Sequence, residues 1–182
     1  VHDGAGRVVA REVALAGGRS SRQLTEYDAL GRVRRESMPF VVGEATYWVE
    51  TAYEPGGRPR SEDRPVSATQ PDGARTRWSY ARLATTSTDA ENRVVTQATD
   101  ARGRLVRVSS TAGGTTAYGY TPFGEVARIT DANGVTTTLA YDARGLPVTV
   151  ESPDAGRRTS TWNAFGELAS QADAASPARV IN

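Results

Sequence analysis

One short motif returns along the whole chain, and it constrains the fold more than any other feature. The motif has an aromatic residue at position 1, Asp at position 2, Gly at position 5 and often Arg at position 6. Its clearest copies are Tyr27–Arg32 and Tyr141–Leu146. Copies begin at residues 2, 27, 53, 80, 99, 120, 141 and 162, which gives spacings of 25, 26, 27, 19, 21, 21 and 21 residues. The constant spacing near the end of the chain indicates tandem copies of one structural unit.

The copies differ in detail, and we interpret their shared residues as a structural motif rather than as a chemical site. His2 occupies the aromatic position of the first copy, the copies at Tyr120 and Trp162 lack the Asp, and Ala84 replaces the Gly in the copy that begins at Tyr80. The motif residues are His2, Asp3, Gly6, Tyr27, Asp28, Gly31, Arg32, Tyr53, Gly57, Tyr80, Asp100, Gly103, Tyr120, Gly124, Tyr141, Asp142, Gly145, Trp162 and Gly166.

The motif has the chemistry of a tight turn. Asp at the first position of a type I turn accepts hydrogen bonds from backbone N–H groups that follow it, and Gly three residues later adopts the left-handed conformation without strain. A second, weaker turn lies about ten residues before some copies. It is found at 131–134 and 89–92, with similar sequences at 72–73, 113–114 and 154–156.

Residues between the turns are rich in Val, Thr, Ile and Leu, as at 104–108, 126–130 and 135–139, and no segment shows helical spacing. Each repeat therefore reads as strand, turn, strand, turn. The sequence predicts an all-β antiparallel meander of tandem β-hairpins, with about fourteen to sixteen strands. Leu146, Val148 and Val150 alternate, but Val126 and Ile129 are three residues apart, which requires a β-bulge or burial on both faces.

Composition excludes several classes of protein. Apolar residues make up 38% of the chain and mean hydropathy is −0.49, as suits half-exposed strands better than a thick core. The net charge is +1 and no basic stripe is present, which argues against a nucleic-acid partner. No apolar run is long enough to span a membrane, and the absence of Cys rules out disulfides and thiolate chemistry.

No constellation of residues points to catalysis, a metal or a cofactor. His2 is the only His, and the turn at 131–134 has its Gly too early for a calcium-binding EF-hand loop. Glu125 and Glu167 occupy equivalent positions in successive repeats and are not expected to converge. The aromatics Tyr120, Tyr141 and Trp162 could line a glycan groove, although such a ladder more often packs one hairpin on the next.

An aromatic-Asp-x-x-Gly-Arg motif at about 21 residues resembles the YD repeat of the Rhs family. That family includes bacterial Rhs polymorphic toxins, the B and C components of Tc toxins, WapA-like proteins and teneurins. The resemblance covers nearly the whole chain and is strongest over 99–162. It implies a sheet that spirals into a hollow shell, encloses a C-terminal toxin and is delivered through a secretion system or toxin translocon.

We therefore expect residues 1–182 to form one YD/Rhs repeat region of a longer chain, irregular over 1–98 and regular over 99–182. The expected role is structural and not enzymatic, with the rest of the shell polypeptide, its toxin domain and a secretion-system or translocon component as partners. The protein would be made in the cytoplasm and then secreted or displayed on the cell surface. The alternative is a surface adhesion or carbohydrate-binding module, with a glycan as partner.

Overall fold

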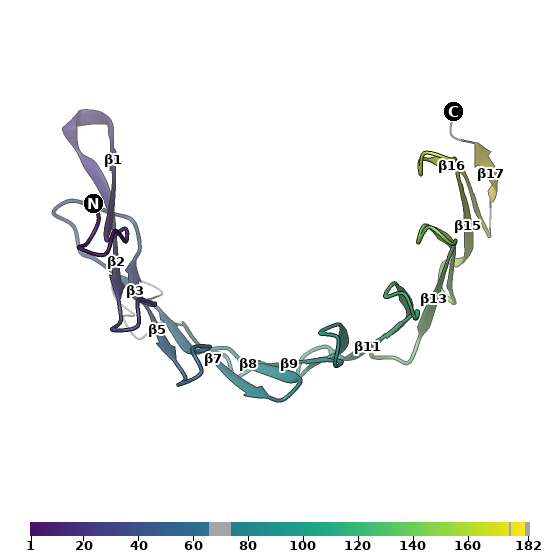
Figure 1. The fold of residues 1–182 in the computed structure, drawn as a ribbon, viewed down its shortest axis with the longest axis horizontal. Helices are drawn as coiled ribbons and strands as arrows, with labels where there is room; N and C mark the ends of the chain where they lie inside the picture. The colour runs from purple at the N-terminus through teal and green to yellow at the C-terminus, as the bar shows by residue number, and fades with distance from the viewer. Residues whose placement is uncertain (66–73, 175, 181–182) are drawn as a thin grey trace. The chain divides into compact units, whose positions relative to one another are not determined.

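The computed structural model describes residues 1–65, 74–174 and 176–180, and their regular secondary structure is almost entirely β-strand (Figure 1). These described residues contain 17 strands and one 3-10 turn, η1 (Ala16–Gly18). This is one strand more than the upper end of the predicted range. The chain divides into two units, residues 1–80 with 86–94, and residues 81–85 with 95–182. The predicted all-β antiparallel meander is confirmed.

The first unit is a series of antiparallel pairs in which β1 pairs with β2, β2 with β3, β3 with β5, β5 with β6, and β6 with β7. A short additional strand, β4, also pairs with β2. The bounds are β1 Ala10–Ala14, β2 Ser20–Tyr27, β3 Val33–Ser37, β4 Phe40–Val41, β5 Trp48–Tyr53, β6 Pro59–Arg64 and β7 Ala74–Ala81. Strand β8 covers Ala84–Thr88.

The meander is interrupted between β3 and β4. Ser37 ends β3 and is only 2% exposed, and its Oγ accepts a hydrogen bond of 2.8 Å from the backbone N–H of Leu24 in β2. The Ser37 hydroxyl therefore satisfies a strand N–H group at the break. The chain passes Pro39, which has no N–H to donate to a ladder, and pairs again with β2 through β4.

In the second unit, each strand from β9 onward pairs with the next one along the chain, always antiparallel. The strands are β9 Val94–Thr99, β10 Leu105–Ser110, β11 Gly114–Tyr120, β12 Val126–Thr130, β13 Thr136–Tyr141, β14 Pro147–Ser152, β15 Gly156–Trp162, β16 Leu168–Asp173 and β17 Ser176–Val180. The 21-residue period is thus one hairpin plus the turn that leads to the next.

A β-bulge recurs at the same point of the repeat. Tyr120 lies opposite Val126 while Gly119 lies opposite Arg128, so Ala127 is an extra residue in β12. The same register shift recurs next to position 1 of five other copies, at Tyr27, Tyr53, Thr99, Tyr141 and Trp162. The bulge accounts for the three-residue spacing of Val126 and Ile129 that simple alternation does not explain.

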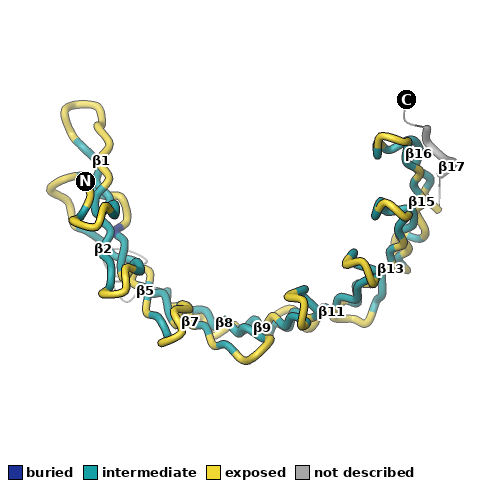
Figure 2. The backbone as a smooth tube through the Cα atoms, viewed as in Figure 1, coloured by how far each residue is buried: buried dark blue, intermediate teal, exposed yellow. Residues whose placement is uncertain are grey.

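The sheet has no buried apolar core in the described part of the chain. None of the hydrophobic residues there is fully buried, and Ser37 is the one buried polar residue. Strands are mostly half-buried and turns exposed, as the tube in Figure 2 shows. Stability therefore has to come from contacts between neighbouring strands and turns, because no second layer of structure covers the apolar side chains.

Candidate functional site: the repeat turns and the ladder between repeats

The motif turn has one geometry, which the turn at Asp100 illustrates. The Asp100 N–H donates to the carbonyl of Arg104 at 2.8 Å, and the Gly103 N–H donates back to the carbonyl of Asp100 at 3.0 Å. Asp100 Oδ1 accepts from the backbone N–H groups of Arg102 and Arg104, at 2.9 and 3.0 Å. Gly103 has φ of +80°, the left-handed conformation that a type I turn with a bulge requires.

Hydrogen bonds from the backbone hold the turn carboxylates in their charged form. Donation by Arg104, first through its backbone N–H and then through its guanidinium, lowers the pKa of Asp100. In Asp142 the backbone N–H of Leu146 is the main cause of a lowered pKa. Both carboxylates are half-buried, and the hydrogen bonds outweigh the opposing effect of partial desolvation.

A second contact joins positions 2 and 6 across most of the motif turns. Asp Oδ2 accepts from the Arg Nε at position 6, with distances of 2.7 Å in Asp3–Arg7, 2.7 Å in Asp28–Arg32 and 2.8 Å in Asp100–Arg104. In two repeats the residue at position 2 is the hydrogen-bond donor and the residue at position 6 is the acceptor. Asn163 Nδ2 donates to Glu167 at 2.7 Å, and the Thr121 hydroxyl donates to Glu125.

The copies with Thr121 or Asn163 at position 2 therefore keep the contact between positions 2 and 6, although they lack Asp. Where position 2 can donate, position 6 is a carboxylate that accepts. Thr121 and Asn163 still accept the backbone N–H bonds of the turn, as the Asp residues do. As predicted, Glu125 and Glu167 are equivalent positions, and each binds within its own turn. In the turn that begins at Tyr141, position 6 is Leu146, and Asp142 pairs with Arg144 instead.

Where position 1 carries Tyr or Trp, this residue connects its repeat to the one before it. Its ring-edge donor reaches the backbone carbonyl at position 7 of the preceding copy, and this bond recurs in both units. The bonds are Tyr27–Val8 at 2.8 Å, Tyr53–Val33 at 2.7 Å, Tyr80–Pro59 at 2.8 Å, Tyr120–Leu105 at 2.6 Å, Tyr141–Val126 at 2.8 Å and Trp162–Pro147 at 2.9 Å. We call this series the aromatic ladder.

Arginine at position 6 reinforces the aromatic ladder. Its guanidinium carbon lies over the ring of the next copy at 4.5 Å for Arg7–Tyr27, 4.4 Å for Arg32–Tyr53, 4.1 Å for Arg58–Tyr80 and 4.5 Å for Arg104–Tyr120. This is the geometry of a cation–π contact. In the next copy Glu125 replaces Arg, and partial burial followed by repulsion from Glu125 raises the pKa of Tyr141.

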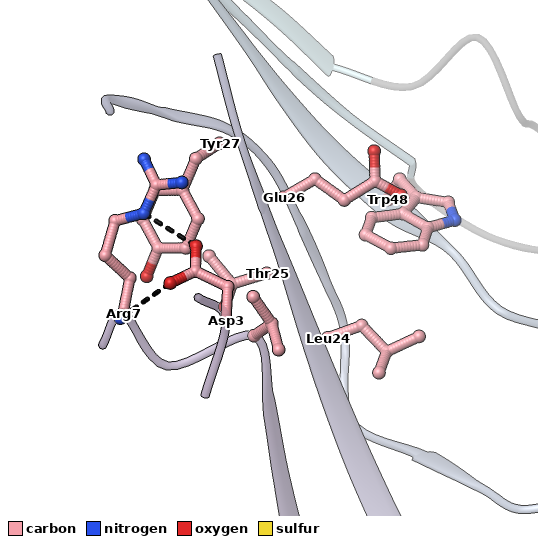
Figure 3. Close-up of a pocket in the computed structure, with 8 residues that line it drawn as sticks. Asp3, Arg7, Leu24, Thr25, Glu26, Tyr27 and Trp48 are labelled. Atoms are coloured by element: carbon pink, nitrogen blue, oxygen red, sulfur yellow. Dashed lines mark hydrogen bonds and ion pairs between the residues drawn. The ribbon is translucent and has the colours of Figure 1, made fainter. Parts of the chain in front are cut away.

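One of these contacts is visible in the open pocket of Figure 3, where Arg7 lies beside the Tyr27 ring and its hydrogen bonds to Asp3 are drawn. Leu24, Glu26 and Trp48 also line this pocket. The charged side chains of this pocket are already in ion pairs, since Arg7 binds Asp3 and Glu26 binds Arg35. The pocket therefore offers no unpaired acid, base or nucleophile for chemistry.

Three motif positions differ from the predicted pattern. Tyr80 keeps its ladder bond, but Ala84 does not replace Gly in a turn, because it begins β8 and lacks a positive φ. Thr99 has no ring, and its N–H binds the carbonyl of Leu83 at 2.8 Å instead. His2 is exposed at the end of the first unit and forms a single β-bridge with Val8.

Two of the turns predicted to be weak have the same geometry as the motif turns. Asp89 Oδ1 accepts from the backbone N–H groups of Glu91 and Arg93, and Asn92 takes the Gly position with φ of +59°. Asp131 binds the backbone in the same way, and Gly134 has φ of +80°. In the Asp89-x-x-Asn-Arg93 sequence, Asp and Arg occupy the positions that they have in the motif turns. The turn predicted at 72–73 lies outside the described residues.

Among the described residues, no three His, Cys, Asp or Glu side chains gather where they could hold a metal ion. Nor does that part of the chain contain a helix long and apolar enough to cross a membrane. The rings of Tyr141 and Trp162 use their polar edge atoms to bind the preceding repeat. This geometry favours packing of one hairpin on the next over a glycan groove as the role of these aromatic residues.

Comparisons with known proteins agree with this geometry. Residues 100–136 and 120–157 match the family model described as RHS Repeat. No curated protein matches the chain. Among solved structures, TcdB2-TccC3-TEV has a TM-score of 0.72 at 20% identity over 95% of this chain, and TcdB2-TccC3-Cdc42 has 0.71 at 19% over 94%. The Photorhabdus luminescens Tc holotoxin pore gives 0.70 at 18% over 94%.

These structural matches establish a shared fold. The chain spans 11% of the length of each of the three toxin chains.

Proposed function

We propose that the chain belongs to the Rhs/YD-repeat family, whose repeat model matches residues 100–157, and that it is a wall segment of an Rhs-type toxin shell. In this role it encloses a C-terminal toxin for delivery into target cells and has no catalytic activity of its own. The full shell is a longer polypeptide, in which residues 1–98 form irregular repeats and 99–182 regular ones.

The aromatic ladder is the observation that carries this proposal. Each repeat with an aromatic residue at position 1 after the first copy binds the preceding repeat through a ring-edge hydrogen bond, and each hairpin of the second unit extends the same sheet. A sheet built in this way extends by repetition and does not need a buried core, which matches the absence of buried apolar residues in the described chain. Such a structure covers a large area with few residues, as a wall requires.

The proposed partners follow from the same role. They are the rest of the shell polypeptide, the enclosed toxin domain and a secretion-system or translocon component. Support for the last comes from the solved structures of similar fold, which are described as TcdB2-TccC3 complexes and as a Tc holotoxin pore. The protein would be synthesised in the cytoplasm and then secreted or displayed at the cell surface.

Protease protection in the full-length gene product tests this function. We expect the region that follows residue 182 to resist digestion in the full-length protein and to be digested rapidly when it is produced alone. Replacing Tyr141 and Trp162 by Ala should abolish protection, because both ladder bonds and rings are lost. The matched control is Tyr118→Ala, since no hydrogen bond is found for the Tyr118 hydroxyl among the described residues. Equal digestion of the downstream region in both contexts would contradict containment.

A further inference from the structure

A groove on the first unit has a lining unlike that of the repeat turns. It lies over β6, β7 and β8, has a volume of about 410 Å³ and contains three arginines and four hydroxyl side chains. Its lining residues are Arg60, Ser61, Arg75, Arg77, Trp78, Ser79, Thr86 and Thr88. No Asp or Glu belongs to this lining. The groove is therefore cationic on a chain whose net charge is only +1.

Strand register brings Ser61, Arg75 and Arg77 to one face of the sheet. Ser61 in β6 lies directly opposite Arg77 in β7, so their side chains share a face. Arg75 is two residues from Arg77 on the same strand and faces the same way. Arg60 is the extra residue of the β6 bulge, because Ala52 pairs with Ser61 while Tyr53 pairs with Pro59. The bulge thus adds a second guanidinium beside Ser61.

Two of these arginines differ from the motif arginines in having no acidic partner. In the part of the chain that the structure describes, Arg60 and Arg77 form no ion pair, and both are exposed. Arg75 is bound to Asp63 next to the groove. The motif arginines, such as Arg58, are already occupied by a carboxylate and a ring. The Arg60 and Arg77 guanidinium groups are therefore available to an external oxyanion.

The position of the groove limits the kind of ligand. It lies on the face of the sheet rather than along an open strand edge, so a peptide cannot add to it as an extra strand. A single-stranded nucleic acid would need a series of aromatic stacking platforms, and Trp78 is the one aromatic residue in the lining. Guanidinium groups interspersed with hydroxyls instead match an elongated ligand that carries both oxyanions and many hydroxyls.

We propose that this groove binds an acidic oligosaccharide, with the sulfate or carboxylate groups of the sugar on Arg60 and Arg77 and its hydroxyls on Ser61, Ser79 and Thr88. Bidentate hydrogen bonds from guanidinium to the oxyanion would supply most of the affinity. This activity goes beyond containment of a toxin, and it would allow the outer or inner surface of the wall to hold an anionic glycan.

Calorimetric titration of the 182-residue chain tests the proposal, with a heparin-derived hexasaccharide as the sulfated probe and an oligogalacturonide as the carboxylated one. The test variant is Arg60→Ser with Arg77→Ser. The matched control is Arg107→Ser with Arg128→Ser, which removes the same charge from exposed arginines in β10 and β12. We expect at least one probe to saturate and the test variant to weaken it about tenfold, against less than about twofold for the control.

A third variant, Arg60→Lys with Arg77→Lys, keeps the charge but removes the planar fork, and should give an intermediate loss. Circular dichroism checks that every variant keeps the β-structure of the parent chain. Preference for one probe identifies whether sulfate or carboxylate is recognised. Equal weakening in the test and control variants overturns the proposal, as does absence of saturation with both sugars. Tighter binding of an acidic peptide of the same charge also overturns it.

Discussion

Removing one hydroxyl from the aromatic ladder should weaken the second unit locally. Tyr141→Phe keeps the ring but deletes the 2.8 Å hydrogen bond from its hydroxyl to the carbonyl of Val126. A neutral hydrogen bond of this kind contributes about 1 kcal/mol, because water replaces it only in part when the acceptor is half-buried. In a chain of this length that loss lowers the unfolding midpoint by roughly 2–4 °C.

Hydrogen exchange is the suitable assay, because a repeat array opens locally before it unfolds as a whole. We expect exchange to accelerate about fivefold in peptides that span 126–141, which is the factor that corresponds to about 1 kcal/mol. The control is Tyr118→Phe, since no hydrogen bond to the Tyr118 hydroxyl is found in the described chain and its ring faces Ile129 across the strands. Equal acceleration in both variants, or none in Tyr141→Phe, would refute the ladder as a source of stability.

Four other predictions concern the turns and the strand edges. Gly114→Ala should lower stability by about 1–3 kcal/mol more than Gly134→Ala in urea unfolding, because both glycines have positive φ but only at Gly114 would the new Cβ lie 2.6 Å from the Cβ of Ala132. The pKa of the turn aspartates is lowered, so their stabilisation is complete above the ordinary value of 3.8 and is lost as pH falls through the lower folded values. Acid titration by circular dichroism should show stability falling in that range, whereas Asp100→Asn should be less stable at neutral pH, depend less on pH and not unfold at a lower pH than the parent chain. Thr121→Asp combined with Glu125→Arg should raise the thermal midpoint, whereas each single change should lower it, because only the pair restores both the turn contact and a cation over the next ring. Light scattering should show concentration-dependent association of the 182-residue chain through open strand edges, and a monodisperse, highly thermostable monomer would contradict this.

The turn at 89–92 is as complete as the motif turns although no aromatic residue precedes it. Asp89 and Arg93 form the same side-chain contact as the motif Asp and Arg. The signal was available in the sequence, as Asp followed four residues later by Arg. The break at Ser37 had no comparable local signal, since it depends on which strand lies opposite.

The sequence by itself determined the repeat, the turns and the all-β class. A turn such as 100–104 closes through hydrogen bonds among five consecutive residues, so its residue types are sufficient to specify it. Only the tertiary structure decided the aromatic ladder, the recurrent bulge and the grouping of Arg60 with Arg77. These contacts join residues on different strands, and a shift of one residue in register would move each side chain to the other face. Composition and spacing do not fix that register, whereas the pairing of the strands does.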